Sequence, residues 1–88
     1  MCTNISYVTG IRGSGKGGGA WFPVSQANVG FDHPVSAPFD HALLIDFVNP
    51  AMGVEARIAV EMNIASGKAL LAQLQAAIEA AERSGVAE

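Results

Sequence analysis

The sequence predicts an α+β fold in which a four-stranded antiparallel β-meander is followed by one C-terminal amphipathic helix packed on one face of the sheet, in the order β-β-β-β-α. Three observations support this prediction. Apolar and polar residues alternate in four short segments before residue 63, residues typical of turns separate these segments, and an alanine-rich stretch with helical periodicity follows them. With 88 residues, the chain is expected to form a single domain, residues 1–88.

The four expected strands differ in how clearly the sequence marks them. The fourth is the clearest, because apolar residues at every second position from Val54 to Met62 alternate with polar ones, such as Glu61, that are expected to face water. The third is apolar on both faces apart from Asp46, which is typical of a central strand. The strands are expected at Thr3–Ile11, Val24–Asp32, His41–Asn49 and Val54–Met62.

The helix is expected to run from Ile64 to Arg83. Asn63 is suited to cap its N-terminus, because an asparagine side chain accepts a hydrogen bond from an early helical N–H. Gly85 is suited to the position just beyond the C-terminal end. One apolar stripe follows the helical spacing and is formed by Leu70, Leu74, Ala77, Ile78 and Ala81.

The composition is unusually apolar for so short a chain. Half of the residues are apolar, 15% are charged, and the mean hydropathy is +0.31. One layer of strands and one helix cannot hide this much apolar surface, so the excess either lines a pocket for a small-molecule ligand or packs against another copy of the chain. We therefore expect a homo-oligomer, a dimer or higher.

Charge and cysteine content exclude several classes of protein. The net charge is −3 and the chain holds five Lys and Arg residues in total, which argues against binding to nucleic acid or to a membrane surface. No apolar run is long enough to span a bilayer, and the N-terminus lacks the pattern of a signal peptide. The single cysteine, Cys2, cannot form an intrachain disulfide. These features predict a cytoplasmic protein.

A glycine-rich segment resembles a phosphate-binding P-loop without meeting its requirements. Residues Gly10–Lys16 fit the first seven positions of that pattern, but Gly17 stands at the eighth, where a Ser or Thr must bind magnesium. The glycines that follow also prevent the helix whose N-terminus would face the phosphates. The sequence therefore predicts no P-loop, and Gly13–Gly19 is expected to be a flexible hairpin loop.

The same segment has a second interpretation as a lid. Arg12 and Lys16 would close over an anionic ligand, and Trp21 beside them would form a wall of the pocket. The alternative is that Trp21 plugs the core and that the loop has no binding role.

Both histidines lie in one proline-containing segment, in which Asp32-His33 and Asp40-His41 repeat the same dipeptide. If the flanking strands pair, the two imidazoles meet at one rim of the sheet, where the aspartates would orient them. An imidazole oriented by a carboxylate is suited to proton transfer near neutral pH. Two alternatives remain open: a divalent-metal site formed by both histidines and an aspartate, and a purely structural role as turn caps.

Several motifs together resemble a family of short bacterial proteins of unknown function that are sometimes found near specialised-metabolite genes. They are the Met-Cys-Thr start, Gly13-Ser-Gly-Lys-Gly17, Trp21-Phe-Pro23, Phe31-Asp-His-Pro34, Asp40-His41 and Ile45-Asp-Phe47. The likeness covers most of the chain up to the alanine-rich helix. It implies an acidic residue before the second histidine, a role attached to a metabolic pathway and a cytoplasmic location, but no particular activity.

The first hypothesis is a small homo-oligomeric protein that binds a small organic molecule and acts without a cofactor, for example as an isomerase or cyclase of specialised metabolism. His33 and His41 would be the acid–base residues, and Asp32 and Asp40 would orient them. The second is a non-catalytic accessory or interaction protein, and the third is a metal-binding module.

Overall fold

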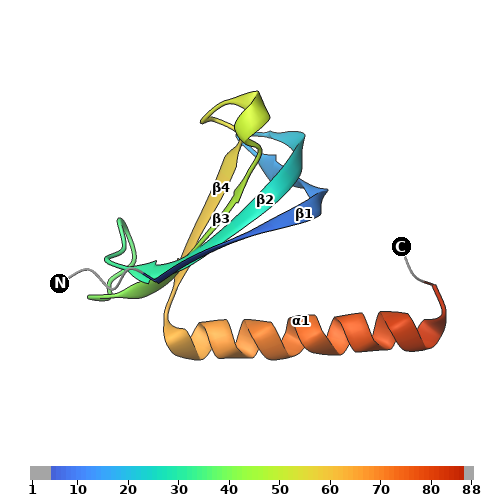
Figure 1. The fold of residues 1–88 in the computed structure, drawn as a ribbon. Helices are drawn as coiled ribbons and strands as arrows, with labels where there is room; N and C mark the ends of the chain where they lie inside the picture. The colour runs from blue at the N-terminus through green and yellow to red at the C-terminus, as the bar shows by residue number, and fades with distance from the viewer. Residues whose placement is uncertain (1–4, 87–88) are drawn as a thin grey trace.

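The computed structural model describes residues 5–86, and the Met-Cys-Thr start with Cys2 lies outside them. The described chain folds as four antiparallel strands in the spatial order β1-β2-β3-β4, followed by one helix (Figure 1). This confirms the α+β fold class and the β-β-β-β-α order. The elements are β1 (Ile5–Gly17), β2 (Ala20–Asp32), β3 (Ala42–Val48), the short 3-10 helix η1 (Pro50–Met52), β4 (Arg57–Met62) and α1 (Ile64–Ser84).

Most of the glycine-rich segment belongs to β1, so the flexible hairpin loop expected over Gly13–Gly19 is reduced to a turn at Gly18 and Gly19. Strands β1 and β2 stay paired as far as Gly17 and Ala20, and the turn between them contains two residues. These residues, Gly18 and Gly19, have φ angles of 60° and 85°, which suit the tight turn that matches the twist of a hairpin. No helix follows this segment, as a P-loop would require.

The start of β2 also differs from the sequence-based expectation. β2 begins at Ala20 rather than at Val24 and therefore includes Pro23, which lies opposite Ser14 of β1. Pairing of β2 with β3 begins only at Gln26, so Pro23 has a strand on one side alone within the described sheet. A proline is tolerated at such a position because its missing N–H is not needed by a second neighbour.

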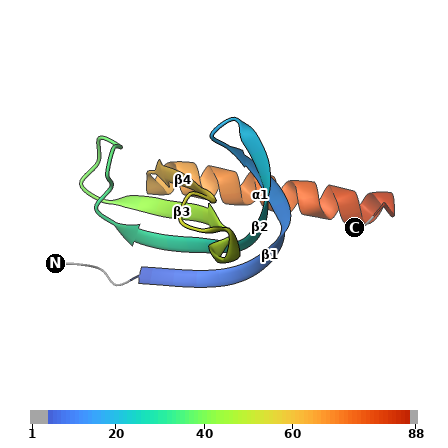
Figure 2. The ribbon, with the colours of Figure 1, turned by 90° about the horizontal axis from the view of Figure 1, so that it is seen from above.

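A bulge bends the β1–β2 hairpin across the sheet. The register shifts between Gly10 and Gly13, which adds a residue to β1 and increases the local twist. Figure 2 shows the hairpin curling toward β4. Gly15 permits this approach, since a Cβ atom there would lie 2.7 Å from Cδ1 of Ile58 and 3.1 Å from Cγ2 of Val24. The glycines thus serve close packing.

The connection between β3 and β4 is longer than expected, so β4 begins three residues after Val54. The Asn49 side chain accepts a hydrogen bond from the N–H of Ala51 at 3.2 Å and caps η1. Gly53 then reverses the chain with a φ of 93°. Val54 lies in this connection and is 93% exposed, so it does not belong to the inward-facing row predicted for the fourth strand.

The sheet has one apolar and one polar face, because residues paired across antiparallel strands point to the same side. One such row joins Tyr7, Val29, Ile45 and Val60. The apolar face is formed by Ile5, Tyr7, Thr9, Ala27, Val29, Phe31, Leu43, Ile45, Phe47, Ile58, Val60 and Met62. The opposite, polar face carries Gln26, Asn28, Asp46, Arg57 and Glu61, with Arg57 Nη2 and Asp46 Oδ1 forming an ion pair at 3.0 Å.

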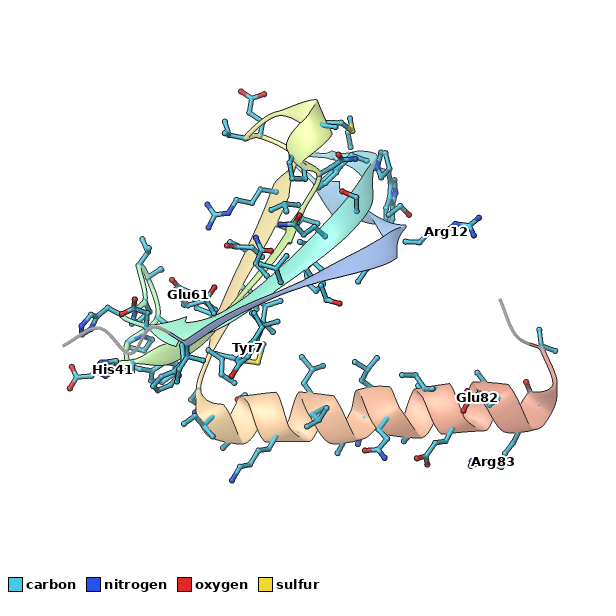
Figure 3. All side chains as sticks on the ribbon, in the orientation of Figure 1. Tyr7, Arg12, His41, Glu61, Glu82 and Arg83 are labelled. Atoms are coloured by element: carbon cyan, nitrogen blue, oxygen red, sulfur yellow. The ribbon has the colours of Figure 1, made fainter. Side chains whose placement is uncertain are left out.

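Helix α1 has the caps that the sequence predicts. The Asn63 side chain accepts a hydrogen bond from the N–H of Ser66 at 2.8 Å, and Gly85 adopts a left-handed φ of 76°. The helix lies on the apolar side of the sheet, and the Tyr7 side chain points to that same side (Figure 3). The helix comes close to the sheet at Gly67, where a Cβ atom would collide with the Leu43 side chain. None of the 21 described residues of α1 is buried, so the helix covers the apolar face less completely than expected.

The described chain has a very small core. Its buried apolar residues are Val24, Ala27, Ala42 and Ala56, and no large side chain in residues 5–86 is fully buried. Large apolar residues on both the sheet and α1 remain about half exposed. Over these residues, no helix combines the length and the apolar content needed to cross a membrane.

Replacement of Gly30 tests the close pairing of β1 and β2. In Gly30→Ala, the new Cβ atom would lie 2.8 Å from the backbone oxygen of Ile5, so the two strands must separate. We expect the free energy of unfolding to fall by about 1–3 kcal/mol, as for other overpacked sites. Urea denaturation measures it.

Gly13→Ala is the matched control. A Cβ atom at Gly13 meets no atom within 4 Å, and Gly13 is not among the glycines with positive φ. Its free energy of unfolding should change by less than about 1 kcal/mol. An equal decrease in the free energy of unfolding of the two variants would contradict the close approach of the strands at Gly30.

Candidate functional site

Pairing of β2 with β3 brings the two histidines together. The last pair of this ladder is Asp32 with Ala42, so His33 and His41 lie side by side just beyond it. Their ring centroids are 4.4 Å apart and their planes are inclined by 34°. The prediction that both imidazoles meet at one rim of the sheet is therefore confirmed.

A third ring extends this pair. Phe31 stacks on His41 with a centroid distance of 5.7 Å and an interplanar angle of 18°. Phe31, His41 and His33 form a row of three rings, called the ring row below, at the end of the sheet where His41 is labelled in Figure 3. His41 is half-buried and His33 is exposed, so one end of the row is open to a ligand.

The aspartates hold this segment differently from the sequence-based expectation. Oδ1 of Asp32 accepts a hydrogen bond from the backbone N–H of His33 at 2.7 Å. Nδ1 of His33 lies 2.9 Å from the backbone oxygen of Asp40. The hydrogen bonds of the described residues thus orient His33 through the main chain of Asp40 rather than through either carboxylate.

The contact with Asp40 determines which nitrogen of His33 carries the proton. A carbonyl oxygen can only accept a hydrogen bond, so Nδ1 must be the donor. In the neutral ring, Nε2 then has the free lone pair and is the atom able to accept a proton from a ligand. The segment between β2 and β3 thereby fixes both the orientation and the tautomer of one imidazole.

Glu61 fixes the position of this segment, a role that the sequence analysis missed. Its Oε2 accepts a hydrogen bond from the N–H of Val35 at 2.6 Å, and its Oε1 accepts from Ser36 at 3.0 Å and Ala37 at 2.8 Å. Three successive backbone N–H groups so arranged form a concave anion-binding nest. Glu61 extends from β4 on the polar face, so a residue distant in sequence ties down the segment that carries the histidines (Figure 3).

These hydrogen bonds favour the charged form of Glu61. The N–H groups of Val35, Ala37 and Ser36, in that order of effect, lower the pKa of its carboxyl group below the ordinary value of 4.5, and burial opposes them slightly. Nothing local in the sequence distinguishes Glu61, near the end of β4, from Glu55, just before the strand begins, and Glu61 was expected only to face water. The role of Glu61 is visible only from its hydrogen bonds to the distant segment of Val35, Ser36 and Ala37.

The residues predicted to form a lid lie at the other end of the sheet. Lys16 is paired with Trp21 next to the β1–β2 turn, and Arg12 lies at the bulge. β2 has 13 residues, so its two ends are up to about 40 Å apart along the strand. Figure 3 shows Arg12 far from His41, on the other side of the sheet. These residues do not join the ring row, and their role in ligand binding stays a prediction.

The metal-binding alternative lacks a third ligand in the part of the chain that the structure describes. Over residues 5–86, no group of three or more His, Cys, Asp and Glu side chains is close enough to hold a metal ion. Structural and catalytic zinc sites use at least three protein ligands. Acid–base, binding and purely structural roles for the two imidazoles all stay predictions.

Acidification should release the histidine-bearing segment. Because the pKa of Glu61 is lowered in the folded state, its contribution to stability is fully present above pH 4.5 and is lost as the pH falls through the lower folded-state value. Backbone N–H groups of Val35, Ser36 and Ala37 should then be less protected from exchange, relative to their intrinsic exchange rates at the same pH, which hydrogen-exchange NMR measures at each residue. Glu61→Gln should show this loss of protection already at pH 7, and Glu55→Gln should not.

Comparison with known proteins places the chain in one family. The profile of DUF6295, described as a family of unknown function, matches residues 1–87. No curated protein matches the chain, and no solved structure matches it. The match spans nearly the whole sequence, including the motifs that carry the resemblance. The chain therefore belongs to DUF6295, a family of unknown function.

Proposed function

We propose that this protein binds a planar, weakly acidic small organic molecule at the ring row and that Nε2 of His33 accepts a proton from it. The observation that carries the proposal is the fixed His33 ring, with Nδ1 bonded to Asp40 and Nε2 left as the proton acceptor. A proton taken from one atom of the ligand and returned to another, by His33 or by His41, gives an isomerisation that needs no cofactor.

The chemistry of the surroundings supports a flat and uncharged ligand. Phe31, His41 and His33 present stacked ring faces, and aromatic groups add to such rows through offset stacking. Asp32 and Asp40 flank the row, and the net charge of the chain is −3, so a ligand that arrives as an anion would be repelled, whereas one that gives its proton to His33 on binding is paired with the protonated ring. A phenol or an enol, which is planar and donates an O–H group, fits both conditions.

A cytoplasmic location and a role in specialised metabolism are part of the same proposal, as is a homo-oligomeric state. The second candidate function, a non-catalytic interaction protein, is favoured by one observation, the exposed apolar face of the sheet. The two functions differ in their dependence on His33: an interaction protein does not need the free nitrogen of its ring.

Substitution of His33 tests the proton acceptor. In His33→Asn, the side-chain amide can still donate to the backbone oxygen of Asp40, but the acceptor at the Nε2 position is gone. We expect the affinity for 4-nitrophenol to fall about tenfold or more, because a hydrogen bond to an ionising group contributes about 1.5–3 kcal/mol. Imidazole chemical shifts and the absorbance of bound nitrophenolate measure this binding.

Two controls separate proton acceptance from stacking. 4-Nitroanisole has the same ring without the O–H group, so it should bind the wild type and His33→Asn equally well. The double variant Arg12→Ala, Lys16→Ala, at the distant hairpin, should bind 4-nitrophenol as the wild type does. Unchanged nitrophenol binding by His33→Asn would refute the proposal, and loss of binding in the double variant would favour the lid.

A further inference from the structure

We propose that α1 of one copy packs on the apolar face of a second copy, in a two-fold pair in which each chain provides one helix and receives one. This inference does not depend on the ligand proposed above. It rests on the surface area of the chain, on two complementary apolar surfaces, and on the short junction between β4 and α1.

The surface area shows how much of the chain is left uncovered. A compact monomer of 9.1 kDa is expected to expose about 4,900 Å², whereas this chain exposes 6678 Å². Its radius of gyration is 14.6 Å, against about 12 Å for a compact domain of this length. The excess of roughly 1,800 Å² per chain gives about 3,600 Å² for a pair, which lies within the range of obligate homodimers.

Helix α1 supplies one half of the expected interface. Gly67 faces Leu43 of the sheet, and the apolar side chains three, four, seven and eleven residues later share its side of the helix. They are Leu70, Leu71, Leu74 and Ile78, which are 49–64% exposed. Side chains so exposed make few contacts with their own sheet and are available to another surface.

The apolar face supplies the other half. It contains no charged residue among the twelve that define it, and Tyr7 on this face is 70% exposed. Its curled end forms a shallow hollow lined by apolar residues such as Val24, Phe47 and Ile58. Depletion of charge and exposed aromatic and aliphatic side chains are typical of the core of a homodimer interface.

The junction between β4 and α1 leaves the helix little freedom to pack more closely on its own sheet. β4 ends at Met62 and α1 begins at Ile64, so Asn63 is the whole connection and is also the N-cap. Any change in the angle between β4 and α1 must be made at Asn63, whose side chain already accepts a hydrogen bond from the first turn of the helix. Short connections of this kind favour exchange of an element between copies.

A second copy satisfies both surfaces at once. Figures 1 and 2 show that the C-terminal half of α1 extends beyond β1, where it is free to reach another chain. Each chain has one helix stripe and one sheet face, so a two-fold operation covers both and leaves neither exposed. Pairing of two β1 edges, by contrast, would leave the apolar faces uncovered.

Matched lysine substitutions on α1 test the interface. Leu74→Lys places a charge in the apolar stripe, and Ala76→Lys places the same charge about 200° around the helix, on its far side. We expect the wild type and Ala76→Lys to sediment at twice the chain mass of 9.1 kDa. Leu74→Lys should weaken association by more than about tenfold. A monomeric wild type, or equal association of both variants, would overturn the proposal.

A second measurement does not depend on the folding of Leu74→Lys. One set of chains carries Cys2→Ser and Ala76→Cys and is spin-labelled at the new cysteine. It is mixed with ¹⁵N-enriched Cys2→Ser chains, which have no cysteine and therefore no spin label. Line broadening in the ¹⁵N-enriched chain then reports contacts between copies only. Broadening along the apolar face, including Tyr7 and Val60, supports helix exchange; broadening confined to the outer edge of β1, or none, overturns it.

Discussion

The ladder between β2 and β3 is the constraint on which the rest of the structure depends. It runs without a break from Gln26 paired with Val48 to Asp32 paired with Ala42, and β1 and β4 attach to its two sides. A slip of one residue would exchange the apolar and polar faces and would also separate His33 from His41. The same register therefore sets both the apolar face of the proposed pair and the ring row of the proposed site.

The polar and apolar faces of the sheet both contribute to the rim that carries His33 and His41. Glu61 holds the histidine-bearing segment from the polar face through three backbone N–H groups. The ring row begins at Phe31, which belongs to the apolar face. A partner helix on that face would lie next to the ring row and would exclude water from one side of it. A nearby apolar wall strengthens the electrostatic interactions of an imidazole with a bound molecule.

The sequence predicts those features that follow from local periodicity. It does not predict features whose structure depends on a contact with a residue distant in sequence. Alternation gives the four strands, and the caps at Asn63 and Gly85 give the helix, because each depends on neighbouring residues. The meeting of His33 and His41 follows from adjacent strands. The hairpin of β1 and β2 was misjudged because glycine permits both mobility and close packing, and Ile58, more than 40 residues away, decides between them. The role of Glu61 depends on a contact 24–26 residues distant.

The small buried core favours the proposed pair over a ligand pocket as the explanation of the apolar composition. A domain of this length gains little stability from one small core, since ordering each residue costs about 1–2 kcal/mol of backbone entropy. Three alanines and Val24 are the buried apolar residues of the described chain, and the hollow beside Ile58 is shallow. A ligand in that hollow would cover a small part of the twelve-residue apolar face and none of the outer half of α1. Burial of both surfaces would take an object as large as another chain, and in the proposed pair the apolar residues of α1 meet the apolar face of the sheet.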